Sequence, residues 1–154
     1  MREKLKILKD SLQKIDRVII YIILISILTL LLYMLIHIFI LLRAQAFIIS
    51  HDIIINARYA LELSILKQEK IVYSFEYSPK YKSALYYWIY GENSKKSYLL
   101  PQLVPSGIKI TSPTNTYTFY FENGNLYPEG EITVSTYLGK RIIKFNRNGK
   151  VGFE

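Results

Sequence analysis

The chain has 154 residues, a formal net charge of +8 at pH 7 and no cysteine. The lack of cysteine excludes disulfide bonds and metal sites built from thiolates. About 110 residues follow the apolar segment near the N-terminus, and a chain of that length builds one small hydrophobic core but not two.

The first segment, residues 1–17, is a short flank in which basic residues outnumber acidic ones. Its cations are Arg2, Lys4, Lys6, Lys9, Lys14 and Arg17, and its anions are Glu3, Asp10 and Asp16. Lys and Arg residues close to a membrane span favour the cytoplasmic side. We therefore expect a cytoplasmic N-terminus and a C-terminal domain outside the cytoplasm.

Residues 18–42 contain no charged residue, no glycine and no proline. At 1.5 Å per residue this run is about 37 Å long, slightly more than the roughly 30 Å hydrocarbon core of a bilayer. It predicts one transmembrane helix in the cell membrane. Ala44-Gln45-Ala46 has the form of a signal peptidase site, but the apolar region of a cleaved signal is only roughly 7–15 residues long. We therefore expect a retained anchor.

Residues 43–70 predict an amphipathic continuation of the same helix. The segment has no glycine or proline, and its apolar residues recur mostly at steps of three and four, as on the covered face of a helix. These residues are Phe47, Ile48, Ile54, Ile55, Ala57, Ala60, Leu61, Ile65 and Leu66, with polar residues such as Ser50 in the gaps. We expect one helix from about Val18 to about Lys70, with its second half against a domain.

From residue 71 the composition changes to short runs rich in Tyr, Phe, Ile, Val and Thr, separated by turns with Gly, Pro or Asn. This pattern is typical of β-strands. Strands are predicted at 71–77, 85–90, 97–100, 108–111, 116–121, 131–136, 141–145 and 151–153. Because the turns are short, neighbouring strands should be antiparallel. The sequence therefore predicts an α+β fold in which a long N-terminal helix packs against a small antiparallel sheet, residues 71–154.

Residues 86–90, Tyr-Tyr-Trp-Ile-Tyr, form an unusually aromatic strand. Apolar side chains on both faces fit a central strand that is covered on both sides. They fit equally a strand with one face that contacts another subunit. The sequence leaves both alternatives open.

The C-terminal half carries short motifs in a fixed order. They are Leu103 to Ile110 (LVPSGIKI), Phe119 to Gly124 (FYFENG), Gly130 to Val134 (GEITV) and Ile142 to Val151 (IIKFNRNGKV). With the long N-terminal helix, this series resembles the type IV pilin and pseudopilin superfamily. Within it, the series resembles the minor pseudopilins of the general secretion H type and their Gram-positive competence counterparts.

That resemblance implies a pilin-like fold and a structural subunit of a type II secretion, type IV pilus or competence DNA-uptake assembly. It implies other pilin-like subunits as partners through the N-terminal helix, and an inner-membrane assembly platform. It also implies a peptidase site, a glycine followed by an apolar residue with a glutamate five positions into the mature chain. No glycine precedes Gly91, and the nearest substitute is Ser11 followed by Leu12, with Asp16 at the fifth position.

No residues form a recognisable catalytic or cofactor site. His37 and His51 are fourteen positions apart, which is about 21 Å along one helix and too far to share a metal ion. Gly124 and Gly130 belong to hairpins and do not open a helix, as a phosphate-binding loop does. We therefore expect no enzyme, no metal and no cofactor.

The predicted closing hairpin is basic, with Lys140, Arg141, Lys144, Arg147 and Lys150 and no acidic residue before Glu154. Such cations could neutralise phosphates, and exposed tyrosines could stack on bases. However, Lys and Arg are usual on any solvent-exposed hairpin, and Tyr is a normal sheet residue. Nucleic-acid contact is therefore the weaker hypothesis for this hairpin.

Two functions remain open. The first is the structural subunit that the resemblance implies. The second is a stand-alone single-pass membrane protein whose exported β-domain binds a ligand or an envelope component. The missing glycine and glutamate favour the second, and the motif series in the sheet favours the first.

Overall fold

The structure is a computed structural model that describes residues 2–154, with side chains from Asp16 onward. Helix α1 runs from Arg2 to Lys67, whereas the sequence predicted about Val18 to about Lys70. The earlier start is explained by the flank 2–17, which contains no glycine or proline to break the helix. The helix ends where Gln68 adopts a left-handed backbone conformation, with φ of 50°, because that conformation stops the helical hydrogen-bond pattern.

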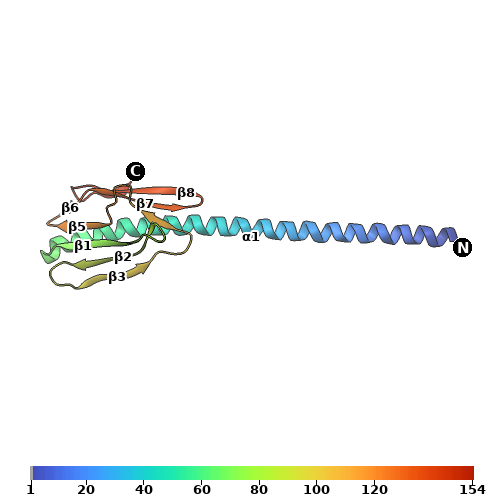
Figure 1. Cartoon of the computed structure of the whole chain (residues 1–154), viewed down its shortest axis with the longest axis horizontal. Helices are drawn as coiled ribbons and strands as arrows, with labels where there is room; N and C mark the ends of the chain where they lie inside the picture. The colour runs from blue at the N-terminus through green and yellow to red at the C-terminus, as the bar shows by residue number, and fades with distance from the viewer. Residues whose placement is uncertain (1) are drawn as a thin grey trace. The chain divides into compact units, whose positions relative to one another are not determined.

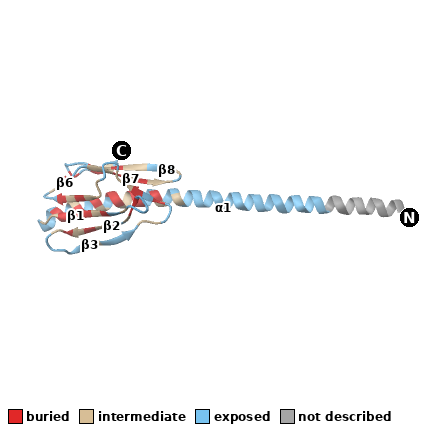
Figure 2. Ribbon diagram, in the orientation of Figure 1, coloured by how far each residue is buried: buried red, intermediate tan, exposed pale blue. Residues whose placement is uncertain are grey.

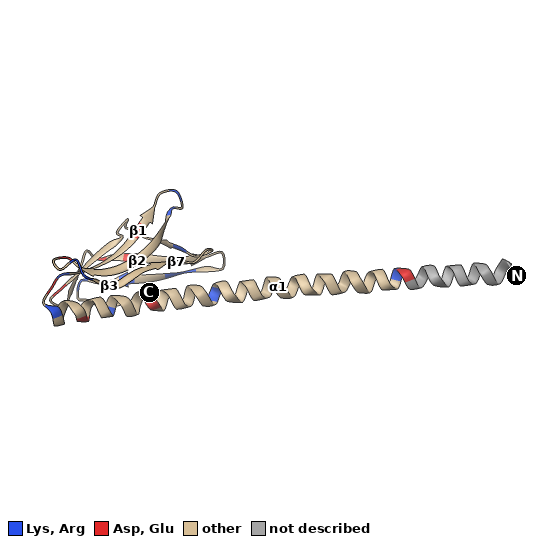
Figure 3. Ribbon diagram, turned by 90° about the horizontal axis from the view of Figure 1, so that it is seen from below, with Lys and Arg blue, Asp and Glu red and all other residues tan. Residues whose placement is uncertain are grey.

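The chain forms two compact units, one through Ile40 and the other Leu41–Glu154. In the first unit, every side chain from Asp16 to Ile40 is exposed. Figure 3 shows a long stretch of α1 without charged residues, which corresponds to residues 18–42. The most apolar window of the helix has a mean hydropathy of 2.9. A helix that is apolar on all sides is typical of a membrane span, and α1 contains one candidate span.

The second unit contains a nine-stranded sheet (Figure 1) in which every pairing is antiparallel. The strands are β1 Ile71–Ser78, β2 Ser83–Gly91, β3 Ser97–Leu103, β4 Lys109–Thr111, β5 Thr118–Glu122, β6 Asn125–Tyr127, β7 Gly130–Thr136, β8 Gly139–Phe145 and β9 Val151–Phe153. Their spatial order is β6-β5-β1-β2-β4-β7-β8-β9, and β3 also pairs with β2. Each predicted strand is present, with ends shifted by a few residues.

Strand β6 is the strand that the sequence prediction missed. Asn123 and Gly124 both have positive φ, 49° and 81°, as in the two-residue turns that join hairpin strands. Strand β6 follows this turn directly, and three residues are too few to show an alternating apolar pattern. Its buried residue Leu126 pairs with Phe121 of β5.

The core lies between the sheet and the C-terminal half of α1. Ile53, Ala57 and Ala60 of the helix are fully buried, and Figure 2 shows buried segments on this part of α1 and on the strands beside it. From the sheet, Phe119 of β5 stacks on Phe145 of β8, with ring centroids 3.9 Å apart and planes 11° apart. The predicted α+β fold, a long helix packed against an antiparallel sheet, is confirmed.

The predicted covered face of the helix was wrong in part. Five of the residues expected on it are exposed, namely Phe47, Ile48, Ile55, Ile65 and Leu66. Ile54, Ala57 and Ala60 are buried as expected. The sheet also covers residues that the prediction did not include, namely Ala46, Ile49, Ser50, Ile53, Leu63 and Ser64. Small residues let the strands approach the helix closely, and the two buried serine hydroxyls donate to helix carbonyls, Ser50 to Ala46 and Ser64 to Leu61. Because α1 is apolar on two sides, residue spacing alone did not identify the covered side.

The aromatic residues 86–90 lie in β2, which has strands on both edges. Tyr87 and Ile89 are buried in the core. Side chains alternate between the two faces of a strand, and on the other face Tyr86 is 37% exposed while Trp88 and Tyr90 are half-buried. Strand β2 is therefore central in the sheet, with one face covered and the other covered only in part.

Candidate functional site

Four apolar residues form a line along the exposed side of α1 in the second unit. Ile48, Ile55, Tyr59 and Leu66 are separated by seven, four and seven positions, and such steps return to nearly the same side of a helix. Their exposed fractions are 55%, 59%, 41% and 77%. We call these four residues the outer stripe.

The outer stripe lies roughly opposite the side of α1 that the sheet covers. At about 100° per residue, Ala57 is on the far side of the helix from Ile48 and Leu66. The second half of α1 therefore has two apolar sides, one of which is buried within the chain. Exposed apolar surface of this kind is typical of protein or membrane contact sites.

The structure divides the basic residues of the closing hairpin. Lys140, Arg141 and Lys144 lie on β8, and Arg147 and Lys150 lie in and after the turn to β9. Because side chains alternate along a strand, Arg141 is on the same face as the buried core residues of β8. Lys140 and Lys144 are on the opposite face. The five cations therefore do not form one patch.

Two of these cations have partners within the chain. The Arg141 guanidinium lies over the rings of Phe47 and Phe153, 4.7 Å and 5.5 Å from their centroids. The Lys144 ammonium pairs with Glu154 and lies 3.5 Å from a carboxylate oxygen of Glu131. The hydrogen bond to Glu154 is the main cause that raises the pKa of Lys144. Both side chains are engaged in packing or pairing, which the sequence prediction did not include.

The proposed processing residues lie in α1. Ser11 and Leu12 are in its helical backbone, and their side chains fall outside the described residues. The side chain of Asp16 is exposed. Helix α1 is continuous through Ser11 and Leu12. Processing at Ser11 stays a prediction.

The two histidines contact aromatic rings. The His37 ring is 4.5 Å from that of Tyr33, and the His51 ring is 4.3 Å from Phe47 and 5.1 Å from Phe153. Among the residues that the structure describes, no three His, Asp or Glu side chains come together as a metal site would need.

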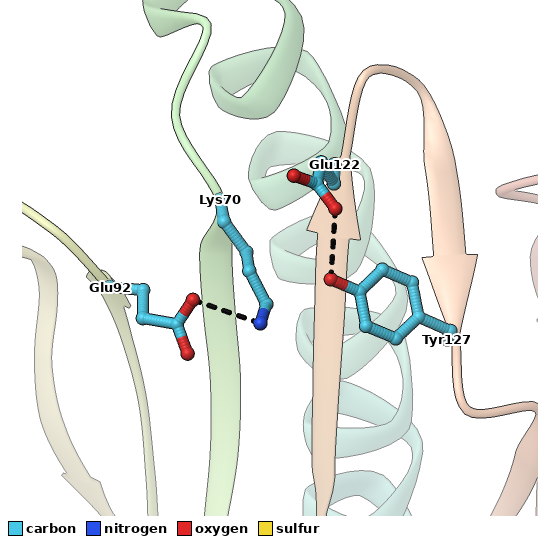
Figure 4. Close-up of polar contacts among 4 residues, drawn as sticks. All are labelled: Lys70, Glu92, Glu122 and Tyr127. Carbon is cyan, nitrogen blue, oxygen red and sulfur yellow. Dashed lines mark hydrogen bonds and ion pairs between the residues drawn. The ribbon is translucent and has the colours of Figure 1, made fainter.

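A polar cluster lies where the chain, after the end of α1, enters the sheet (Figure 4). The Lys70 ammonium is 2.9 Å from a carboxylate oxygen of Glu92 and lies over the Tyr120 ring, 4.4 Å from its centroid. The hydrogen bond to Glu92 raises the pKa of Lys70. Beside it, the Tyr127 hydroxyl donates to Glu122 over 3.0 Å. These contacts connect β1, β2, β5 and β6, which gives the cluster a structural role.

Two buried tyrosines lie between the sheet and α1. Burial raises the pKa of Tyr73 well above its ordinary value. Burial is also the main cause that raises the pKa of Tyr87 to about 12, and the negative charge of Asp52 adds to it. The Tyr73 hydroxyl has no hydrogen-bond partner among the described residues. Both phenols stay protonated at neutral pH, and both rings pack in the hydrophobic core.

No family model and no curated protein sequence matches the chain. Two solved structures are similar to it, and both are crystal structures of the type IV minor pilin FimU from Pseudomonas aeruginosa, in two crystal forms. One covers 68% of this chain and 89% of the pilin, and the other covers 73% and 87%. Each has a TM-score of 0.53 and 14% sequence identity. The chain has the type IV pilin-like fold.

Proposed function

We propose that the chain is a minor pilin-like subunit of a membrane-based assembly of the type II secretion, type IV pilus or competence class. The observation that carries this proposal is the outer stripe. A single sheet covers one side of α1, and the second apolar side remains for the helices of neighbouring subunits. In this proposal the chain binds and packs against other subunits and does not catalyse a reaction.

The outer stripe lies beyond the uncharged run 18–42, where the surroundings are aqueous if that run is the part that crosses the membrane. Complete burial of one large aliphatic or aromatic side chain contributes roughly 1.5–3 kcal/mol. Burial of the four side chains of the outer stripe would therefore contribute to helix–helix contact. Before assembly, lipid would hold residues 18–42, and on assembly the helices of other subunits would replace it.

The orientation that fits this role has the basic flank 1–17 in the cytoplasm and the sheet outside it. In that arrangement the N-terminal part of α1 is available to an inner-membrane assembly platform. The sheet is then available to neighbouring subunits or to cargo.

Cysteine cross-linking tests the proposal, because the chain has no cysteine of its own. Tyr59→Cys places one thiol on the outer stripe, and Asn148→Cys places one in the exposed turn before β9 as the matched control. In membranes of the native cell, the Tyr59→Cys thiol would be alkylated with a maleimide–benzophenone reagent. On irradiation the benzophenone should insert into a C–H bond of a neighbour and link the chain to a second protein with a long apolar N-terminal helix. Adding Ile55→Asp to that chain should reduce the product at least tenfold, and the Asn148→Cys chain should not form it.

The alternative is a stand-alone single-pass protein whose β-domain binds a ligand or envelope component. It is favoured by the absence of a glycine before Gly91, since a pilin-type peptidase site needs one. If the Tyr59→Cys chain gives no product while a control reagent labels its thiol fully, the subunit proposal fails and this alternative takes its place.

A further inference from the structure

A pocket of about 580 Å³ lies where the β1–β2 turn, the β3–β4 loop and the β7–β8 turn meet. Its wall is mainly apolar and includes Leu85, Leu103, Val104, Pro105 and Ile108. Sites for small ligands typically have volumes of roughly 300–1,000 Å³ and apolar walls with a few polar groups. The subunit contacts proposed above do not use this pocket.

The pocket lies beside the start of the second unit. Gly107 lines it, and a Cβ atom added to Gly107 would be 2.9 Å from Cδ2 of Leu42. Leu42 is the last residue of the uncharged run 18–42, and Arg43 follows it. The wall of the pocket therefore lies beside the last residue of the uncharged run.

The rim of the pocket has the residues that prefer a membrane surface. Tyr81, Leu103 and Tyr137 are 54%, 65% and 89% exposed, and tyrosines are enriched where hydrocarbon meets water. Lys109 lines the pocket, and the Lys80 ammonium is 5.3 Å from the centroid of the Tyr81 ring. None of the described residues that line the pocket is acidic. This combination of apolar wall, tyrosines and lysines complements a phospholipid, with an acyl chain inside and a phosphate at the rim.

We propose that the pocket binds one acyl chain of a phospholipid from the membrane leaflet next to the sheet, with the lipid phosphate beside Lys109. The proposal rests on the membrane anchoring of residues 18–42 that the proposed function includes. Bound lipid would hold the second unit against the membrane surface before the subunit joins its partners.

Quenching of tryptophan by lipids with brominated acyl chains tests this proposal on the full chain. Trp88 is the sole tryptophan, so Trp88→Phe gives a silent background in which each variant carries one reporter. Tyr137→Trp is the rim reporter, Tyr33→Trp is the span reporter, and Asn148→Trp is the turn reporter, in a turn that does not line the pocket. Each is reconstituted into vesicles of phosphatidylcholine and phosphatidylglycerol, with and without bromine.

We expect bromine to reduce the emission of the span and rim reporters at least twofold and to leave that of the turn reporter unchanged. Leu103→Asp should restore at least half of the lost emission of the rim reporter, because it places a charge in the pocket wall. Leu100→Asp is the matched control, since Leu100 is on the same strand, is 71% exposed and does not line the pocket. It should restore none.

The outcomes separate the two proposals. Quenching of the span reporter without quenching of the rim reporter leaves the anchor in place and overturns the lipid site. No quenching of the span reporter overturns both. Equal quenching of the rim and turn reporters overturns the lipid site, because the second unit then lies on the bilayer without a specific pocket. A concentration-dependent blue shift of the rim reporter without quenching overturns it in favour of a second copy of the chain as the occupant.

Discussion

Ala57→Asp is expected to destabilise the second unit by about 3–5 kcal/mol, the usual cost of an unpaired buried charge. Ala57 has no exposed surface and lies where α1 meets the sheet. A carboxylate there would lose its hydration and force the helix and strands apart. Urea unfolding of the full chain in detergent micelles, followed by Trp88 fluorescence, measures the change.

Ile55→Asp is the matched control, because the same side chain is introduced two positions away on the outer stripe. Ile55 is 59% exposed, so the free energy of unfolding should change by no more than about 0.5 kcal/mol. Equal destabilisation by the two variants would show that the sheet does not distinguish the two sides of the helix. That result would contradict the packing described above.

Phe119→Ala should also cost about 3–5 kcal/mol, the range for removal of a buried phenylalanine. Phe119 has no exposed surface, and its ring stacks on Phe145 of a strand in the other half of the sheet order. Its loss leaves a cavity where β5 and β8 meet above the helix. The same urea experiment measures the change in the free energy of unfolding.

Tyr137→Ala provides the comparison, since it also removes an aromatic ring but from a side chain that is 89% exposed. It should change the free energy of unfolding by less than about 0.5 kcal/mol. If Phe119→Ala changed the free energy of unfolding as little as Tyr137→Ala does, Phe119 would not be a central core residue. The stacked pair would then have no special role in holding the two parts of the sheet together.

The main elements were predictable from the sequence because their signals are local. An uncharged run without glycine or proline determines a helix of membrane length, and glycine, proline and asparagine turns separate the strands after residue 71. In β5, Phe119 and Phe121 are buried and Tyr120 between them is not, as expected for a strand with one covered face. Short turns then made antiparallel pairing the simplest arrangement.

Other features depend on contacts between distant residues and gave no local signal. The sheet covers the side of α1 with Ala57 and Ala60, while the larger Ile55 and Leu66 are exposed. This choice depends on how closely the strands approach. Arg141 looked like a free cation in the sequence, yet it packs on Phe47 from the helix and Phe153 from the last strand. The pocket likewise forms from three connections that are far apart along the chain.

The most direct test of the central claim is the pattern of thiol reactivity along α1. Single cysteines at Ile55, Ala57, Tyr59 and Ala60 would be introduced into the full chain, purified in detergent so that no partner covers the helix, and treated with a maleimide. Cysteines at 55 and 59 should react at least tenfold faster than those at 57 and 60. Similar rates at all four positions, or faster reaction at 57 and 60, would contradict the claim that the sheet covers one apolar side of the helix and leaves the other for a partner.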